Sequence, residues 1–463
     1  MGEALPPGRL ARALLASAAL AACSGEGSAP EVRPDLVLVV VDTLRADHLH
    51  HAGYPLPHSP QLDRLKQQST WFPNAYAGSS WTLPSLASLF VSEPPSLHGV
   101  VTWEALLDSR ASTLAEALAR GGYRTGGFSA NFLVTRETGI PQGFEEYAIV
   151  YNFEAWQRQW GEGVLPSALG RYVTEQALAW IRAVRAESPR RPLFAYLHYM
   201  EPHTPYRCPD PADTACEREA EELAVRLVNR RWGFDAGEAR RIVELYDGQV
   251  AAIDAALAPL LAELEAGPSS DRTWLVVTAD HGESLGEEGL YLHGESLASR
   301  EIRVPLLWSG PSRRGSRVET PVSLLDLAPT LLDLAGLPAP ASFRGRSLRP
   351  ALEGKDLAPA PVVAELFPRS AVPPRHRLAV IAGDEKLLVD AEGAVARVDL
   401  REDPGEAAPG PAGPEELERA LGPAAAWIDL ARQPVAPARE LGPELRRQLE
   451  ALGYGLAAPG TGP

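Results

Sequence analysis

Four residues with chemically useful side chains stand where predicted strands end or a predicted helix begins: Asp42, Thr82, Asp280 and His281. Two carboxylates, an imidazole and a hydroxyl suit a hard or borderline divalent cation, such as Mn²⁺, Zn²⁺, Mg²⁺ or Ca²⁺. Such a cation also favours the alkoxide of threonine, which is otherwise a weak nucleophile at neutral pH. The pattern predicts one divalent metal ion beside a nucleophilic Thr82.

Thr82 begins a stretch with the pattern of a helix. Pro84 fits a first turn, and Leu83, Leu86 and Leu89 follow at helical spacing. Because a helix N-terminus attracts anions, a hydroxyl there is either an N-cap or a nucleophile beside an anion site. The stretch alone favours the cap, whereas the ligands elsewhere in the chain favour the nucleophile.

Two apolar runs lead to the predicted metal ligands. Residues 36–41 end at Asp42, and residues 273–278 lead into Asp280 and His281. Such runs are typical of strands buried on both faces of a parallel sheet. Open α/β sheets hold their ligands at the carboxyl ends of these strands. Alternating strands and helices along the chain predict a doubly wound α/β domain.

The rest of the chain divides at a region rich in proline and alanine near residues 338–361. We predict a catalytic domain at 35–345 and a C-terminal subdomain at 346–463. Residues 144–190 have a mostly helical pattern. The C-terminal part predicts an antiparallel sheet, from short strands at 377–381, 386–390 and 395–400.

Composition limits the partners. The chain has 463 residues, 45% of them hydrophobic, and a formal net charge of -16. This content supports a sizeable core, and the negative charge argues against a nucleic-acid partner, which would need a basic footprint. Lysine is scarce and occurs only as Lys66, Lys355 and Lys386.

The N-terminus has the features of an export signal. Basic residues precede an apolar run at 14–22, which is too short to span a bilayer permanently. The run ends in Leu-Ala-Ala-Cys, which resembles the lipobox of bacterial lipoproteins. The resemblance implies a signal peptide at 1–22, lipidation of Cys23, a tether at 23–34 and a membrane-anchored protein of the periplasm or cell envelope. An ordinary signal peptide with an incidental cysteine is the alternative.

Cys208 and Cys216 bracket a short turn-rich segment. An exported chain lies in an oxidising compartment, and such a loop brings two thiols together, so we predict a disulfide. A zinc-binding pair is the alternative, although no further cysteine stands nearby.

Several longer motifs resemble the sulfatase family of the alkaline phosphatase superfamily. VVVDTLRADHLHHAGYPLPHSPQLDRL is similar to its N-terminal signature, and GSSWTLPSLASLF to its nucleophile segment. HYMEPHTPY resembles its middle histidine motif, and VTADHGESLGEEGLYLHGES its second metal motif. The motifs follow the family's order between about residues 35 and 406.

This resemblance implies a large central mixed sheet flanked by helices and a small C-terminal antiparallel sheet. It places Thr82 where sulfatases carry the cysteine that becomes formylglycine. His203 matches the histidine that contacts the substrate's anionic group, and His293 lies in a loop that often holds a substrate-contacting or proton-donating residue. The metal ligands that it implies are Asp42, Asp280 and His281.

The nucleophile segment departs from the formylglycine pattern, which needs cysteine or serine, then proline and arginine. Here the residues are Thr82, Pro84 and Leu86, and no lysine stands near the motifs. Threonine at this position resembles the nucleotide pyrophosphatase/phosphodiesterases and lipoteichoic acid synthase, which form phospho-threonine intermediates. The expected chemistry is therefore that of a threonine nucleophile.

A second metal site is not expected. The phosphodiesterases bind a second metal through a D-x-x-x-H pattern, whereas Asp247 and Asp254 are each followed by alanine at that spacing. We interpret these two carboxylates as helix-surface or packing residues and predict one metal.

The leading hypothesis is a metal-dependent hydrolase or transferase acting on an anionic phosphate or sulfate ester. Thr82 would attack the ester, His203 would hold its anionic oxygens, and His293 would protonate the leaving group. One alternative is sulfate-ester hydrolysis without formylglycine. Another is an inactive lipoprotein that binds an anionic glycan or lipid headgroup, suggested by Leu86 and by Glu288, where the family loop often has histidine.

Overall fold

The computed structural model describes residues 33–150, 169–208, 212–230, 233–367, 376–428, 434–443 and 446. The predicted signal peptide, Cys23 and nearly all of the predicted tether lie outside these residues. In the described part, no helix is long and apolar enough to cross a membrane.

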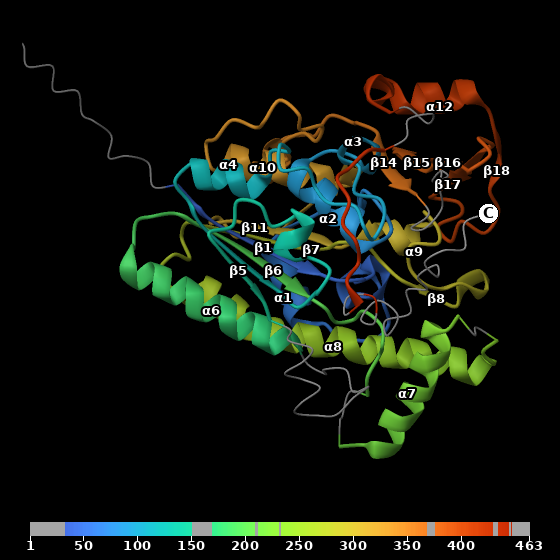
Figure 1. Cartoon of the computed structure of the whole chain (residues 1–463), viewed down its shortest axis with the longest axis horizontal. Coiled ribbons are helices and arrows are strands. Elements are labelled where there is room, and N and C mark those ends of the chain that lie inside the picture. Colours follow the sequence, from blue (N-terminus) through green and yellow to red (C-terminus); the bar gives the residue numbers. More distant parts are fainter. Residues whose placement is uncertain are drawn as a thin grey trace, which may run out of the picture. The chain divides into compact units, whose positions relative to one another are not determined.

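An eight-stranded mixed sheet forms the centre of the fold (Figure 1). Its strands lie in the order β12-β2-β11-β7-β1-β6-β4-β5. From β7 to β5 neighbouring strands are parallel, whereas β11 runs antiparallel to β7. The predicted α/β class with a mixed sheet is confirmed. The strands are β1 (Asp35–Val41), β2 (Thr70–Trp71), β4 (Arg124–Ser129), β5 (Glu146–Ile149), β6 (Leu193–Tyr199), β7 (Thr273–Ala279), β11 (Leu306–Ser309) and β12 (Ser316–Arg317).

Helices cover both faces of this sheet. In Figure 1, α6 and α8 lie on one side, and α2, α4 and α10 lie on the other. Because of this double cover, every residue of β1 is buried, which explains its continuous apolar run. The α-helices are α1 (Pro60–Gln67), α2 (Thr82–Val91), α3 (Pro95–His98), α4 (Leu114–Arg120), α6 (Leu169–Glu187), α7 (Thr214–Val228), α8 (Ala236–Ala266), α9 (Ser299–Ile302), α10 (Leu327–Leu334), α11 (Arg349–Leu352) and α12 (Pro414–Leu421).

The helical prediction for residues 144–190 is wrong at its start. Residues 146–149 form β5, which pairs in parallel with β4 at the edge of the sheet. This short strand is exposed or half-buried along its length, so it lacks the apolar run that marks the inner strands. The helix itself, α6, is present from Leu169 to Glu187.

The C-terminal part contains the predicted antiparallel sheet, with five strands in the order β14-β15-β16-β17-β18. The three predicted strands form β15 to β17, and the sequence pattern missed the two outer ones. Helix α12 packs against this sheet through Leu417 and Leu421. The strands are β14 (Val362–Leu366), β15 (Arg377–Ala382), β16 (Glu385–Val389), β17 (Val395–Asp399) and β18 (Gly410–Ala412).

Two small sheets connect the loops between these parts. One has the order β10-β3-β13, and the other pairs β8 with β9. Their strands are β3 (Ala75–Tyr76), β8 (Ser284–Leu285), β9 (Tyr291–Leu292), β10 (Arg303–Val304) and β13 (Val322–Ser323).

A buried ion pair joins the C-terminal sheet to the loop after β9. Lys386 Nζ donates to both Glu406 oxygens at 2.8 and 2.9 Å and to the Leu297 carbonyl at 2.6 Å. Glu406 also accepts the Ser299 N–H at 2.9 Å. Lys386 is fully buried, and burial lowers its pKa, while the charge of Glu406 opposes this shift. The pair therefore ties residues 297–299 to the C-terminal sheet.

We expect Glu406→Ala to destabilise the protein by about 3–5 kcal/mol, because it leaves the Lys386 ammonium buried without its counter-charge. Denaturant unfolding would measure the loss. Glu402 is exposed and lies four residues earlier in the chain, and Glu402→Ala should change the free energy of unfolding by less than about 0.5 kcal/mol. Equal stabilities of the two variants would contradict this role for the pair.

Candidate active site

The three predicted metal ligands meet at the carboxyl ends of two neighbouring strands. Asp42 follows β1, and Asp280 and His281 follow β7, which is the parallel neighbour of β1. All three side chains are fully buried, and their ligand atoms lie within 4.8 Å of one another. His281 Nε2 is 3.8 Å from Asp42 Oδ1 and 3.4 Å from Asp280 Oδ2. Parallel pairing is thus what brings together residues far apart in the sequence.

The chemistry of this donor set fits a divalent cation. Asp42 Oδ1 and Asp280 Oδ2 are buried and have no hydrogen-bond partner among the described residues. The other oxygen of each carboxylate is bonded: Asn131 Nδ2 donates to Asp42 at 2.7 Å, and the N–H groups of Thr43 and His281 donate to Asp280. Buried carboxylate oxygens without partners are costly, and a bound cation removes that cost.

The orientation of His281 agrees with this role. Its Nδ1 lies 2.9 Å from the Gly282 carbonyl, to which it can only donate. This bond places the N–H on Nδ1 and leaves Nε2, the atom nearest the two carboxylates, as the ligand atom. Such a bond from the far side of the ring is a common feature of histidines that bind metals.

The surroundings shift the pKa values of the two carboxyl groups in opposite directions. Burial raises the pKa of Asp42, but the approach of His198 and the charges of His203 and His281 outweigh it and lower that pKa to about 2. Burial and the neighbouring charge of Asp42 raise the pKa of Asp280 well above its usual range. Two ionised carboxylates at this separation therefore need a positive partner.

Thr82 does not cap its helix. Trp81 is the N-cap of α2, and Thr82 is the first helical residue, with no capping bond from the N-cap side chain. Thr82 Oγ1 instead lies 3.3 Å from His281 Nε2. The interpretation of Thr82 as a cap is therefore wrong. Ser85, on the first turn, donates to the Asp280 carbonyl at 2.6 Å and fixes the start of α2 against the end of β7.

The two loop histidines lie beside this group. The His293 ring is 4.4 Å from the His281 ring and 5.0 Å from the His203 ring, measured between centroids. His203 follows β6 on a loop, and His293 follows β9. Both side chains are nearly buried. The His293 ring thus lies near both other imidazoles, and His281 is the one beside Thr82.

Sequence reasoning missed the residues that hold His293 in place. Glu283 is fully buried, and its Oε1 lies 2.9 Å from His293 Nδ1. Burial raises the pKa of Glu283 well above its usual range. Glu301, also buried, accepts the N–H groups of Gly294 and Ser296 and so shapes the turn after His293. A glutamate directly after the Asp280-His281-Gly282 turn was the available signal.

Asn131 and His198 were also missed as neighbours of the ligands. Asn131 donates to Asp42 Oδ2, and His198 Nε2 lies 3.4 Å from the same oxygen. His198 lies near the end of β6, the neighbour of β1, and Asn131 follows β4, the next strand beyond β6. Their position suits them to orient Asp42.

Asp247 and Asp254, which we interpret from the sequence as helix-surface or packing residues, are nearly buried and make hydrogen bonds within the fold. Asp254 accepts the N–H groups of Gln61 and Leu62 at the start of α1, at 3.0 and 2.9 Å. Asp247 accepts the Tyr54 hydroxyl at 2.7 Å and lies 2.8 Å from His48 Nδ1. Neither belongs to a group with metal-ligand spacing in the described part of the chain.

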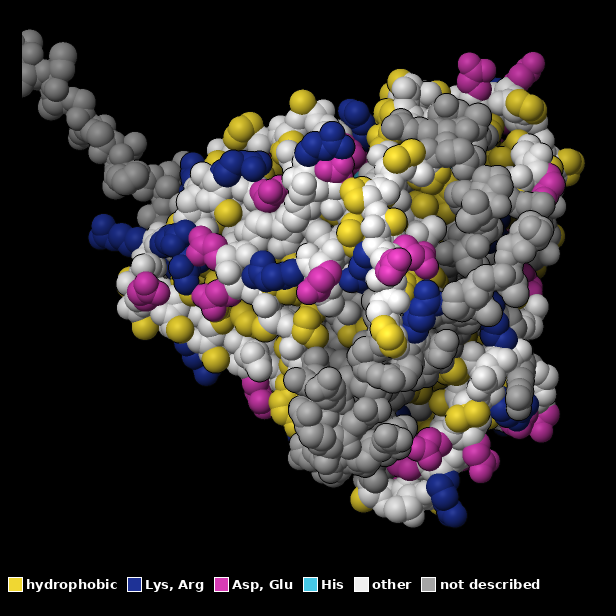
Figure 2. All heavy atoms as spheres, in the orientation of Figure 1, with side chains coloured by type: hydrophobic (Ala, Val, Ile, Leu, Met, Phe, Trp, Pro, Cys, Tyr) yellow, Lys and Arg dark blue, Asp and Glu magenta, His cyan; other side chains and the backbone are white. Residues whose placement is uncertain are grey.

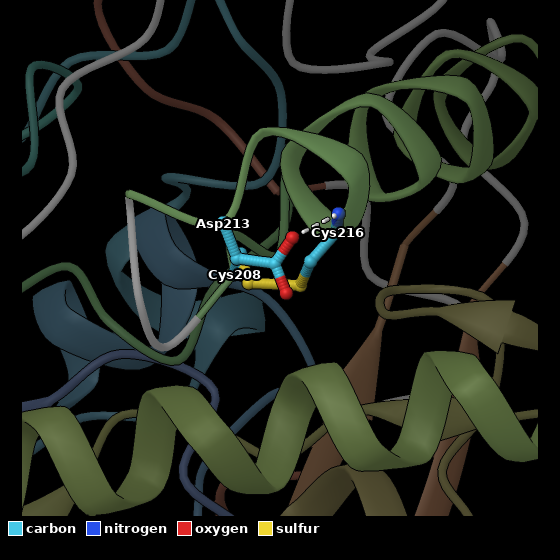
Figure 3. A group of neighbouring side chains, drawn as sticks. All are labelled: Cys208, Asp213 and Cys216. Atoms are coloured by element: carbon cyan, nitrogen blue, oxygen red, sulfur yellow. Dashed lines mark hydrogen bonds between the residues drawn. A yellow bond between two sulfur atoms is a disulfide. The ribbon is translucent and has the colours of Figure 1, made fainter.

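The predicted disulfide is present between Cys208 and Cys216, with an S–S distance of 2.00 Å (Figure 3). Asp213 caps α7 by accepting the N–H groups of Ala215 and Cys216, each at 3.1 Å. Because the two sulfurs are bonded to each other, they are not available as thiolates, so this cluster does not support the zinc alternative.

Comparison with known proteins then decides the family. A family model described as Sulfatase matches residues 34–337. The chain belongs to the sulfatase family. As a member, it is classed with enzymes that act on ester bonds.

Individual relatives agree with this assignment at modest identity. An extracellular sulfatase homologue of Drosophila melanogaster is 25% identical over 72% of this chain, which covers 32% of that relative's length. A choline-sulfatase of Rhizobium meliloti is 26% identical over 71% of each protein. The structure of a phosphonate monoester hydrolase of Agrobacterium radiobacter has a TM-score of 0.70 at 22% identity, covering 87% of this chain and 96% of that one.

We expect Asp280→Asn to weaken Mn²⁺ binding by about 100-fold or more, because it removes a charged ligand from the buried group. Titration calorimetry on the purified protein would measure this. Asp254→Asn is the matched control, since it removes a carboxylate that caps α1 and should leave the affinity unchanged. The same Mn²⁺ affinity in wild type and Asp280→Asn would contradict the assignment.

Proposed function

We propose that the protein is a metal-dependent hydrolase or transferase of phosphate esters in which Thr82 is the nucleophile. The observation that carries this proposal is Thr82 Oγ1 at the start of α2, 3.3 Å from His281 Nε2. The N–H groups of the helix start favour negative charge on this oxygen or on the group that it attacks. A divalent cation held by Asp42, Asp280 and His281 would supply positive charge that favours the alkoxide and offsets charge on the ester.

The surrounding side chains support a complete reaction. The Thr82 hydroxyl loses its proton to solvent, and Oγ1 forms a bond to phosphorus while the bond to the leaving oxygen breaks. Protonated His293 gives that leaving oxygen a proton. His203 holds the anionic oxygens, and Glu283 orients His293 through the contact at Nδ1. Water or an acceptor alcohol then attacks phosphorus and gives its proton to His293, while the bond from phosphorus to Thr82 Oγ1 breaks and that oxygen takes a proton from solvent. The reaction is hydrolysis when water is the acceptor and transfer when an alcohol is the acceptor.

A phosphate ester is favoured over a sulfate ester as the substrate because the chain lacks the arginine of the formylglycine pattern and has no lysine near Thr82. Leu86 stands where the formylglycine pattern has arginine, and it is fully buried in the core. Lys386 is committed to Glu406, and Lys355 lies 2.7 Å from Glu353 at the surface. Lys66, the third lysine, lies beside Trp71 on another part of the molecule. Histidines rather than lysines therefore stand next to Thr82.

Hydrolysis of sulfate esters without formylglycine is a second candidate. The names of the relatives favour a sulfate ester, including the choline-sulfatase at 26% identity.

Glu288, one of the two departures that suggested an inactive protein, lies at the surface with its carboxylate 3.3 Å from Arg300. Its place in a surface ion pair gives a structural reason for the residue apart from loss of activity.

We expect Thr82→Val to lower kcat on an aryl phosphate ester by ~10³-fold or more, since it removes the attacking oxygen and keeps the shape of the side chain. Thr82→Ser should keep part of the activity. Steady-state assays of the Mn²⁺-loaded protein would use phosphate monoester, phosphate diester and sulfate ester in parallel. Ser88 lies on the same helix, with its hydroxyl in a hydrogen bond with His98. Ser88→Ala is therefore the control and should retain wild-type kcat.

The outcomes separate the candidates. Unchanged turnover in Thr82→Val would refute the nucleophile, whereas Thr82-dependent turnover that is faster on the sulfate ester would favour the second candidate. Mass spectrometry of the protein quenched during turnover would show phosphate on the peptide that carries Thr82 if the phosphate-ester reaction is correct.

We also propose that the mature protein is exported and anchored to the membrane through a lipid on Cys23. The lipobox-like sequence before Cys23 and the Cys208–Cys216 disulfide, which suits an oxidising compartment, support this.

In a bacterial host, Cys23→Ser should abolish labelling by a radioactive fatty acid and move the protein out of the membrane fraction. Ser28→Ala in the predicted tether is the control and should keep the label. A Cys23→Ser protein that still carries the fatty acid would exclude this anchor.

A further inference from the structure

A pocket of about 450 Å³ that has none of the three metal ligands in its lining opens beside Trp71. Three cationic side chains line it: Lys66 from α1, Arg303 from β10 and Arg317 from β12. Glu319 is the one carboxylate in the lining. The lining is therefore net positive in a chain whose formal net charge is -16.

This gathering contrasts with the surface shown in Figure 2, where acidic and basic side chains are interspersed over the face in view. Lys66 Nζ lies 5.0 Å from the Trp71 ring centroid, and the Arg317 guanidinium carbon lies 4.7 Å from a centroid of the same ring. The indole thus holds two like charges next to one cavity. An anion bound in the cavity would be attracted by both of these charges.

The cations are incompletely paired within the described part of the chain. Arg317 forms an ion pair with Glu319, whereas the side chains of Lys66 and Arg303 have no hydrogen bond or ion pair with a described residue. The charge of Arg303 acts on Asp47, but the ion pair of that carboxylate is with Arg45, at 2.8 Å. Lys66 and Arg303 therefore retain donors that a ligand can use.

Polar groups without charge complete the lining. His51 Nδ1 lies 3.3 Å from Asp63, and burial lowers the pKa of His51, so the ring adds a neutral polar edge. Asn74 directs its amide to the Glu319 carbonyl at 2.8 Å, which holds this side of the pocket. The cavity volume falls within the range of about 300–1,000 Å³ that is usual for small-molecule sites and exceeds what one oxyanion fills.

We propose that this pocket binds a sugar-sized molecule that carries a sulfate or phosphate group, with Lys66, Arg303 and Arg317 as the anion's partners. Arginine and lysine form short charge-assisted hydrogen bonds to such oxyanions. The remaining volume accommodates the ring to which the anion is attached. The site is separate from the Thr82 centre, so the proposal does not depend on the reaction proposed there.

The test uses an Asp42→Asn, Thr82→Val protein, which silences the proposed catalytic centre. Titration calorimetry would compare glucose 6-phosphate, glucose 6-sulfate, inorganic phosphate and glucose. We expect saturable binding of the two sugar esters, weaker binding of inorganic phosphate and no binding of glucose. Equal affinity for inorganic phosphate and the sugar esters would overturn the sugar-sized ligand, and no saturable binding would overturn the site.

Variants in the same background assign the binding to the pocket. Lys66→Met with Arg317→Met should weaken sugar-ester binding by about tenfold or more, because each change removes a charged donor but keeps an apolar stem. Lys355→Met with Arg110→Met is the matched control, since it removes the same charge from exposed positions elsewhere. An equal loss of affinity in both pairs would show a general effect of charge and refute the pocket.

Arg317→Met alone serves as a variant that should remain folded, because the Arg317 side chain is 56% exposed. It should bind the sugar esters several-fold more weakly while its thermal unfolding midpoint stays that of the parent protein. Unchanged affinity in this folded variant and in the double variant would refute the assignment.

Discussion

Two buried carboxylates at the ends of neighbouring parallel strands are the constraint on which the rest of the site depends. Asp42 and Asp280 each direct one oxygen into a space where the described residues offer it no hydrogen bond. Burial makes this arrangement costly without a cation, so the surrounding sheet and helices must hold both groups in place. The pairing of β1 with β7 and the bond from Ser85 to the Asp280 carbonyl provide that rigidity. The start of α2, with Thr82, is positioned by the same contacts.

A second group of buried glutamates organises the loops over this centre. Glu283 contacts His293, Glu301 binds the backbone after it, and Glu406 binds Lys386 and Ser299 farther along. These contacts form a connected series from the metal ligands to the C-terminal sheet. The C-terminal sheet thus supports the site, because its Lys386 helps to hold the segment that follows the His293 loop. Each member is buried, so each depends on its partner to remain satisfied.

The start of α2 carries Thr82 at the position that the sequence resemblance assigns to the family's nucleophile. A threonine at the start of α2 retains a hydroxyl at a helix N-terminus, and Leu86 fills the core instead of presenting a charge. His281 Nε2 lies 3.3 Å from this hydroxyl, and the His293 ring lies between 4.4 and 5.0 Å from the rings of His281 and His203. Family membership accounts for the scaffold, while the proposed reaction depends on the chemistry of these side chains.

The sequence by itself determined the α/β class, the inner strands and the identity of the proposed ligands Asp42, Asp280 and His281. An apolar run that ends in a carboxylate can be read from neighbouring residues alone. It predicts a buried strand with a polar end, whatever the order of the strands in the sheet. Only the tertiary structure decided that Trp81 rather than Thr82 caps α2, that β5 closes the sheet edge, and that Asn131 and Glu283 support the site. These outcomes depend on strand order and on contacts between distant segments, such as Asn131 with Asp42. A local pattern does not encode such contacts, because packing and register set which side chains meet.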